Sequence, residues 1–277
     1  MGGHPGPGGL KRDARVAVKP LSRGWATDLM VRRLSGSLIE DRGDCIVVRT
    51  AANPTFFWGN FVLARTDWGD APRWLTVFRE AFPEARHVAI GVDGAPVSDV
   101  PRDAYEALGL VAEASVVLTA PATRIASAAS DECELLIIDD DWRQALELSL
   151  AMDGELAGRQ EHRLFCERRN AEARRLSELG RGFWLGGFVD DRLRSSLGLL
   201  TDGSGLGRYQ MVQTHPEFRR RGLARGLVAT AADIGLTRFG VEELVIVADP
   251  GYHAVELYHA LGFVESEAQL QFQLAVY

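Results

Sequence analysis

The chain has 277 residues, which is more than one typical domain needs and predicts two domains of similar size. Apolar residues make up 46% and charged residues 25% of the chain, as in soluble globular proteins. The net charge of −7 argues against a nucleic-acid-binding protein, because neutralising phosphates requires a basic face. Three widely spaced cysteines, Cys45, Cys133 and Cys166, form no CxxC pair and favour a reducing compartment over a disulfide framework.

Residues 1–20 are expected to form a flexible N-terminal segment. Its first nine residues, M-G-G-H-P-G-P-G-G, are too polar and too rich in glycine for the apolar core of a signal peptide. No apolar run approaches the length that a membrane span requires. These features predict a cytoplasmic protein without membrane contact.

Hydrophobic periodicity and turn residues predict a first series of elements within residues 21–128. Helices are expected at Trp25–Leu34, Pro72–Phe82 and Asp103–Leu108, and strands at Cys45–Arg49, Phe56–Ala64, His87–Val92 and Val111–Thr119. The segment Pro121–Asp131 is rich in Ala, Ser and Thr and is interpreted as a linker.

A second series of elements follows within residues 129–277. Strands are expected at Glu134–Ile138, Gly182–Asp190, Ser195–Thr201, Tyr209–Thr214, Leu244–Ala248 and Glu267–Val276. Helices are expected at Asp140–Ala151, Arg159–Leu179, Gly222–Leu236 and Ala254–Leu261. The order of elements predicts an α/β (α+β) fold with mixed, mostly antiparallel sheets flanked by helices.

The two halves contain similar segments. Tyr105–Leu110 (Y-E-A-L-G-L) matches Tyr258–Phe263 (Y-H-A-L-G-F) almost position by position, and upstream Val88–Gly94 resembles Leu244–Gly251. Coincidence is the simpler explanation, since A-L-G is a common end to a helix. The agreement in order and spacing over three elements favours a degenerate internal duplication.

The most informative stretch is Thr214–Val228, T-H-P-E-F-R-R-R-G-L-A-R-G-L-V. A strand ends there, arginines follow, and Gly222 opens a helix whose first turn has free N–H groups and the positive end of the helix dipole. A solvated basic turn is the alternative, but strand, glycine and helix in this order favour a pyrophosphate-binding site. Neither a P-loop nor a Rossmann fingerprint is present.

These residues resemble a known family. Arg219-x-x-Gly222-x-Ala224 is similar to the [QR]-x-x-G-x-[GA] signature of the GNAT N-acetyltransferase superfamily. Val212–Pro216 resembles the strand before that signature, and Leu257-Tyr258-x-x-Leu261-Gly262-Phe263 resembles the later L-Y-x-x-x-G-F segment. The resemblance covers roughly residues 135–276, and the first half looks like a degenerate copy. It implies a tandem arrangement, with a degenerate GNAT-like domain at 21–128 and a catalytic GNAT domain at 129–277.

The resemblance implies acetyl-CoA, or another acyl-CoA, as the donor. The main chain of Val212 and Thr214 would pair with the pantetheine arm, and the Val212 N–H would polarise the thioester carbonyl. Tyr258 matches the family tyrosine that protonates the leaving thiolate. The residues expected to hold the pyrophosphate, through backbone groups or charge, are Arg219, Arg220, Arg221, Gly222, Leu223, Ala224 and Arg225.

The general base is less clearly marked. Asp249 at a strand end is favoured over Glu217, His215 and His253, although a solvated polar residue is the plainer interpretation of each. The family often has an asparagine where this chain has Gly251, so one cofactor contact is missing or supplied elsewhere. No metal site is expected.

The predicted activity is transfer of an acetyl group to a primary amine by direct attack in a ternary complex. A non-catalytic CoA-binding regulatory module is the alternative, and Gly251 gives it some support. The acceptor is expected to be a small-molecule or peptide amine, and the resemblance makes a homodimer plausible. In the first half, the aromatic stretch Asn53–Asn60 either lines an acceptor pocket or, as we favour, buries the interface between the halves, with Trp58 and Asn60 as its key residues.

Overall fold

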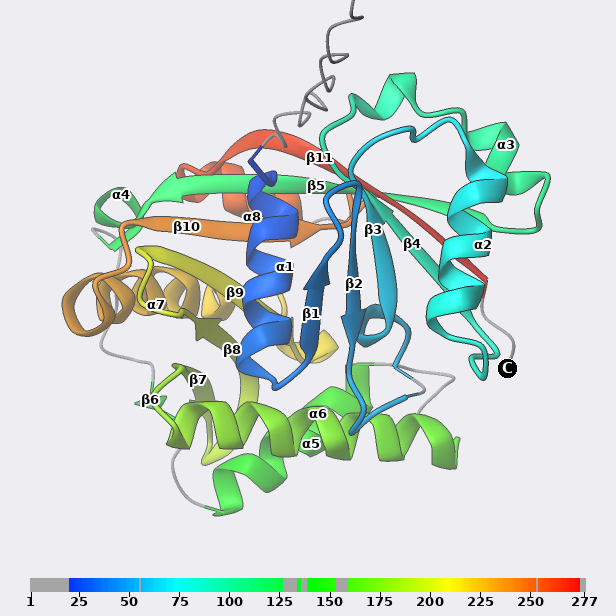
Figure 1. The fold of residues 1–277 in the computed structure, drawn as a ribbon. Helices are drawn as coiled ribbons and strands as arrows, with labels where there is room; N and C mark the ends of the chain where they lie inside the picture. Colours follow the sequence, from blue (N-terminus) through cyan, green and yellow to red (C-terminus); the bar gives the residue numbers. More distant parts are fainter. Residues whose placement is uncertain are drawn as a thin grey trace, which may run out of the picture.

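The computed structural model describes residues 20–54, 56–126, 134–135, 139–152, 159–252 and 254–274. The first half contains α1 (Arg23–Leu34), β1 (Leu38–Asp41), β2 (Cys45–Arg49), η1 (Phe57–Gly59), β3 (Phe61–Ala64), α2 (Ala71–Ala81), β4 (Val88–Val92), η2 (Val97–Asp99), α3 (Arg102–Glu106), β5 (Val111–Pro121) and α4 (Ala122–Ala126) (Figure 1). The predicted N-terminal segment up to residue 19, Cys133 and the candidate base His253 lie outside the described residues.

The second half begins with β6 (Glu134–Leu135), α5 (Asp139–Met152), α6 (Gln160–Glu178), β7 (Gly182–Val189) and β8 (Arg192–Leu200). It continues with β9 (Leu206–Thr214), η4 (Pro216–Phe218), α7 (Leu223–Phe239), β10 (Glu243–Ala248), α8 (Ala254–Leu261) and β11 (Val264–Leu274). The mixed α/β architecture predicted from the sequence is confirmed. Most elements begin and end within a few residues of their predicted bounds.

Two predictions about local structure are wrong. The stretch predicted as one strand at Phe56–Ala64 is a 3₁₀ turn followed by β3, because the Asn60 side chain closes the preceding loop. Its amide donates to the carbonyls of Asn53 and Phe56, and its Oδ1 accepts from the N–H of Thr50. Part of the predicted linker is α4, which is held by the buried side chains of Ala122 and Ile125. The short edge strand β1 was not predicted from the sequence.

All the strands that the structure describes form one sheet in the order β1-β2-β3-β4-β11-β5-β10-β9-β8-β7-β6. Its centre is an exchange of strands between the halves. The last strand of the first half, β5, pairs antiparallel with β10 of the second half. The last strand of the second half, β11, pairs antiparallel with β4 of the first half. Because β5 and β11 also pair with each other, the two halves share a continuous ladder of hydrogen bonds (Figure 1).

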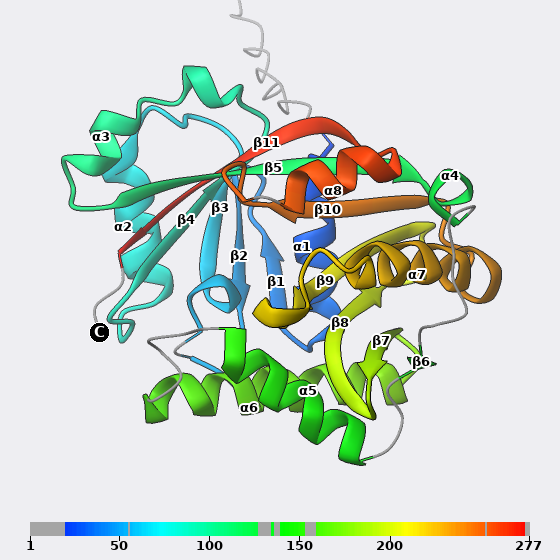
Figure 2. The same ribbon diagram turned by 180° about the vertical axis from the view of Figure 1, so that it is seen from behind.

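The hydrophobic cores follow this exchange. Leu270 and Phe272 of β11 lie in the core of the first half, whereas Val116 and Leu118 of β5 lie in the core of the second. A third cluster joins α1 to the second half, packing Met30 and Val31 among residues that include Trp142, Leu176 and Trp184. Helices α5 and α6 lie side by side at the end of the molecule that this cluster fills (Figure 2).

A buried ion pair adds a polar contact between the halves. Arg208 on β9 is almost fully buried, and its guanidinium contacts Asp28 of α1 at 2.9 Å and the hydroxyl of Thr27 at 2.8 Å. The other carboxylate oxygen of Asp28 accepts from the side-chain amide of Gln269 on β11 at 2.7 Å. A buried charge is tolerated only when it is paired and hydrogen-bonded, so this network fixes the position of α1 against the second half.

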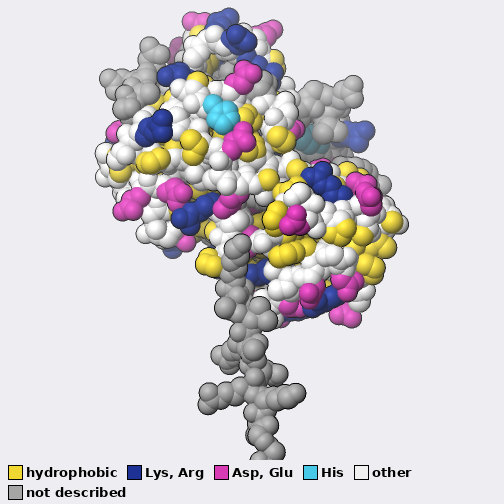
Figure 3. Space-filling view, turned by 90° about the horizontal axis from the view of Figure 1, so that it is seen from above, with side chains coloured by type: hydrophobic (Ala, Val, Ile, Leu, Met, Phe, Trp, Pro, Cys, Tyr) yellow, Lys and Arg dark blue, Asp and Glu magenta, His cyan; other side chains and the backbone are white. Residues whose placement is uncertain are grey.

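The surface is mixed in charge on the face seen from above in Figure 1. Basic and acidic side chains are interspersed there with single hydrophobic ones (Figure 3). Among the helices that the structure describes, none combines the length and the hydrophobicity needed to span a bilayer.

The Arg208–Asp28 pair makes a testable contribution to stability. Asp28→Ala leaves the buried guanidinium without its counter-charge, and we expect it to lower the free energy of unfolding by about 3 kcal/mol. Urea denaturation followed by circular dichroism measures this change. Glu40→Ala removes an exposed pair with Arg42 and Arg49 and serves as the control, for which little change is expected. Equal losses of stability in Asp28→Ala and Glu40→Ala would show that the buried pair with Arg208 contributes no more than an exposed one.

Candidate active site

The two strands that frame the candidate site, β9 and β10, separate partway along their length. They pair in parallel only where Glu243–Val245 lie beside Leu206–Arg208. Strand β10 stays bonded to β5 over all its residues, from Glu243 opposite Pro121 to Ala248 opposite Val116. Beyond the paired segment, β9 and β10 run on without pairing, and this divergence faces the beginning of α7 (Figure 2). The facing edges therefore expose backbone donors and acceptors to a ligand.

A bulge in β9 lies at this divergence. Gln210 pairs with Gly198 and Gln213 with Ser196, so Met211 and Val212 together oppose the single residue Leu197 of β8. Met211 has φ of +51°, in the left-handed region that side chains other than glycine seldom occupy. Strained backbone of this kind clusters at functional sites, and a bulge redirects the groups beside it. The predicted role of the Val212 N–H depends on this local geometry.

The entrance of α7 has the geometry expected of an anion-binding turn. Arg220 has φ of +60° and Gly222 has φ of +86°, and α7 begins at Leu223. The first helical hydrogen bond runs from the Gly226 N–H to the Gly222 carbonyl, so the first-turn N–H groups have no partner inside the helix. The N-cap residue, Gly222, has no side chain with which to cap them. A Cβ atom on Gly222 would meet nothing within 4 Å, so the turn is open on this side.

The arginines of this turn differ in how firmly they are held. All four are exposed: Arg219, Arg220, Arg221 and Arg225. The guanidinium of Arg221 lies over the ring of Phe218, 4.6 Å from its centroid, and Arg194 lies 4.4 Å from the same centroid. Arg219 Nε donates to the carbonyl of Thr214 at 3.4 Å. Thus Arg219 and Arg221 stabilise the turn through these contacts, in addition to giving it charge.

Tyr258 lies on α8, between the core and the candidate site. Its side chain is buried and packs edge-on against Phe263, and this burial raises the pKa of its phenol to about 12. No described residue is seen to hydrogen-bond its hydroxyl, in contrast to Tyr209, whose hydroxyl donates to the carbonyl of Val228. Tyr258 is therefore a protonated, unengaged donor at neutral pH, which suits a general acid.

The predicted bases lie on the same end of the sheet but on different elements. Asp249 follows β10 and is exposed, and its Oδ1 accepts from the N–H of Gly251 at 2.8 Å. Glu217 is also exposed, and Nδ1 of His215 accepts from its N–H at 3.4 Å. Within the described ranges, no three His, Cys, Asp or Glu side chains gather as metal ligands would. Asp140, in the first turn of α5, is paired with Arg143.

The first half has a counterpart of this site, but its own side chains occupy the key positions. The carboxylate of Asp70 caps α2 by accepting from the N–H of Arg73 at 3.1 Å. Tyr105, the counterpart of Tyr258, stacks on Phe272 and donates its hydroxyl to the carbonyl of Trp68 at 2.8 Å. An anion at the beginning of α2 would meet the carboxylate of Asp70. The hydroxyl proton of Tyr105 is already engaged in the hydrogen bond to the carbonyl of Trp68.

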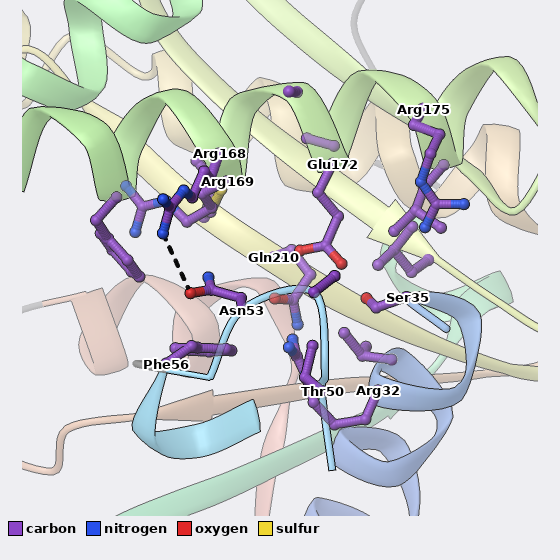
Figure 4. A pocket seen from close by; sticks show the side chains of 18 of the residues that line it. Arg32, Ser35, Thr50, Asn53, Phe56, Arg168, Arg169, Glu172, Arg175 and Gln210 are labelled. Atoms are coloured by element: carbon purple, nitrogen blue, oxygen red, sulfur yellow. Dashed lines mark hydrogen bonds between the residues drawn. The ribbon is translucent and has the colours of Figure 1, made fainter. Parts of the chain in front are cut away.

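A cavity of about 700 Å³ lies between the halves. Its walls are α6 on one side and the end of α1 with the loop after β2 on the other, and Gln210 and Met211 of the β9 bulge contribute to its lining (Figure 4). Of the aromatic stretch singled out in the sequence, Phe56 lines this cavity. Trp58 instead packs in the core of the first half and donates to the side chain of Gln273, and Asn60 is the buried clamp of the loop.

Comparison with known proteins finds a family match in the second half. Residues 142–263 match the model of the Acetyltransferase (GNAT) family. The matched residues contain β9, α7, β10 and α8, and with them the divergence, the turn and Tyr258. No curated protein matches the chain in sequence.

Solved structures share the fold of the whole chain. A conserved protein of unknown function from Staphylococcus epidermidis superposes with a TM-score of 0.70 at 12% identity, covering 86% of this chain and 92% of that one. A GCN5-related N-acetyltransferase from Kribbella flavida has a TM-score of 0.64 at 14% identity, covering 92% and 95%. A tandem GNAT protein from the clavulanic acid biosynthesis pathway has a TM-score of 0.53 at 18% identity, covering 86% and 83%. The first half is therefore GNAT-like in structure, as predicted.

The raised pKa of Tyr258 predicts a pH dependence of stability. Because the folded-state pKa of about 12 exceeds the usual value of 10, the stabilisation of the neutral phenol is complete below pH 10 and is lost as the pH rises towards 12. Wild type should lose up to about 1.4 kcal/mol per pH unit relative to Tyr258→Phe in this range. Urea denaturation at pH 8, 10 and 11 measures the difference. A difference that stays constant over this range would show that Tyr258 titrates normally.

Proposed function

We propose that the protein is an acyl-CoA-dependent N-acyltransferase that moves an acetyl group from acetyl-CoA to a primary amine. The observation that carries this proposal is the combination, in one GNAT domain, of diverging strands, a strained bulge and an open helix entrance. An extended thiol arm fits the divergence as an added strand, and a pyrophosphate fits the first turn of α7. Both belong to one ligand, coenzyme A.

The donor would be bound mainly through the backbone. The N–H groups from Arg221 to Arg225 would face the pyrophosphate, while Arg219 and Arg220 add positive charge. The main chain of Val212 and Thr214 would pair with the pantetheine arm. The N–H of Val212 would then point at the thioester oxygen and stabilise the charge that develops on it.

Transfer would proceed by direct attack. The amine nitrogen forms a bond to the thioester carbon, the carbon–sulfur bond breaks, and Tyr258 gives its proton to the leaving thiolate. The amine loses a proton to the base, for which Asp249, acting through water, remains our candidate. The products are the acetylated amine and CoA, and Tyr258 recovers its proton from solvent.

The first half would bind no donor. The carboxylate of Asp70 occupies the position at the beginning of α2 that a phosphate would need, and Tyr105 is tied to Trp68. We therefore assign the first half a structural role and a part in forming the cavity between the halves.

Thiol release tests the activity and the role of Tyr258 together. With a panel of primary amines, wild type should release CoA thiol, and Tyr258→Phe should lower kcat by about 100-fold or more, as loss of a general acid does. Acetyl-CoA affinity should be unchanged, because the phenol acts on the leaving group. Unchanged turnover would remove Tyr258 from the mechanism. Binding of acetyl-CoA without thiol release for any amine would favour the non-catalytic CoA-binding module.

Calorimetry tests the donor site. We expect one CoA per chain, and Gly222→Ala should weaken binding by about 10-fold or more because the added methyl strains the turn and projects into the open space beside the first-turn N–H groups. Gly203→Ala is the matched control, since Gly203 has φ of +85°, nothing within 4 Å of an added Cβ, and a place outside the proposed site. Two CoA molecules per chain, or equal weakening by both substitutions, would contradict this site.

A further inference from the structure

The cavity between the halves has an unusual charge. Four arginines line it, Arg32, Arg168, Arg169 and Arg175, with Glu172 as the only carboxylate among the lining residues that the structure describes. The chain as a whole carries a net charge of −7. Gathering like charges in a partly enclosed space is unfavourable without a counter-charge. This excess of positive charge therefore indicates an anionic ligand.

Two of the arginines each lie over an aromatic ring of their own half of the chain. Arg32 of α1 lies over the ring of Phe56 at 5.0 Å from its centroid, and Arg169 of α6 lies over Phe165 at 5.2 Å. The two rings are themselves 6.0 Å apart. Stacking uses the face of a guanidinium and leaves the N–H groups at its edge available for a carboxylate.

Polar atoms in this wall lack partners in the described structure. Nε of Arg169 and Oγ of Ser35 are buried without a hydrogen bond. At the rim, Arg168 donates a long hydrogen bond of 3.5 Å to Oδ1 of Asn53 (Figure 4). Buried polar atoms are nearly always satisfied, so Nε of Arg169 and Oγ of Ser35 indicate a site that is completed by a bound molecule.

Glu172 supplies the opposite charge. Its side chain extends from α6 towards the middle of the cavity, between Arg169 and Arg175 (Figure 4). None of the ion pairs between described residues involves its carboxylate, although it lies near enough to Arg32 to oppose the lowering of that guanidinium's pKa by burial. A free carboxylate among arginines suits a ligand that carries both an ammonium group and an anion.

The cavity also reaches the place where the acetyl group would lie. Gln210 and Met211 of the bulge line it, and Met211 precedes Val212, whose N–H we place on the thioester oxygen. A ligand in the cavity would therefore present its amine to the thioester carbon. The volume of about 700 Å³ is in the range of small-molecule sites.

We infer that this cavity binds the acceptor, and that the acceptor is a primary amine bearing an anionic group and an apolar side chain, as in an apolar amino acid. Arg32 and Arg169 bind the anion, Glu172 binds the ammonium group until it is deprotonated, and Phe56 and Phe165 contact the apolar part. This inference rests on the proposed acetyl transfer. It gives the first half a role in choosing the substrate.

The test compares matched amines in the thiol-release assay. Phenylalanine, leucine and methionine are each paired with their amides, and the aminophosphonic acid analogue of phenylalanine separates a carboxylate site from a phosphate site. The best of the acids should exceed its amide in kcat/KM by about 10-fold or more, and Arg169→Met should remove most of that advantage through KM. Glu172→Gln should raise the KM of acids and amides alike. Arg163→Met, an exposed arginine on α6 paired with Glu167, is the control and should change nothing.

Amide substrates that equal or exceed the acids would overturn the inference, as would equal losses for both in Arg169→Met. If Arg169→Met unfolds, the same comparison of acids with amides is made with Arg168→Met, which replaces an exposed arginine at the rim of the cavity. Titration of the amino acids without acetyl-CoA separates the two proposals. If acetyl-CoA fails to bind while the acids bind and Arg169→Met weakens them, the acyltransferase proposal fails and the anion site stands. If acetyl-CoA is consumed with neutral amines alone, the acyltransferase proposal is supported and the proposed anion site in the cavity is contradicted.

Discussion

The antiparallel ladder between β5 and β11 is the contact on which the rest of the molecule depends. Each of these strands ends its own half, yet its other edge pairs with a strand of the opposite half. Val111 lies opposite Gln273, and its counterpart Val264 lies opposite Thr119, so the exchange is nearly two-fold symmetric. Neither half can complete its sheet or fill its core without the other, since the buried residues of β5 and β11 belong to the opposite cores. The two halves therefore form one structural unit.

The exchange also accounts for the geometry of the proposed donor site. Strand β10 is bonded to β5 along its whole length, so its course is set by a strand from the other half. Strand β9 is bent by the bulge at Met211 and Val212 and follows β8. The divergence between them results from these two separate attachments. The pair of Arg208 with Asp28 and the third hydrophobic cluster hold α1 against the second half, and Phe56 of the loop after β2 packs against Phe165 of α6. The cavity forms where these parts meet.

The sequence was most informative where function depends on neighbouring residues. The turn from Thr214 to Gly222 and the segment at Tyr258 are each local, and their element types followed from periodicity and from glycine. The strand exchange could not be predicted, because pairing between distant strands leaves no periodic signal in either one. The arginines of α6 were not recognised as cavity residues, since nothing in the local sequence reveals that Arg169 lines a cavity shared with the first half. The Asn60 clamp was missed for the same reason, as its partners depend on the folded loop.

The two halves are alike in fold but differ at the positions that bear on the proposed function. Each half has a tyrosine on the helix that precedes its last strand, Tyr105 on α3 and Tyr258 on α8. Tyr105 is hydrogen-bonded and stacked, whereas the hydroxyl of Tyr258 has no partner among the described residues. The N-cap residue is Asp70 before α2 and Gly222 before α7, so a carboxylate occupies one helix entrance and leaves no room for a second anion, whereas Gly222 places no side chain at the other. In the function that we propose, the first half binds no donor. Its loop and α1 instead supply Phe56 and Arg32 to the acceptor wall that we propose.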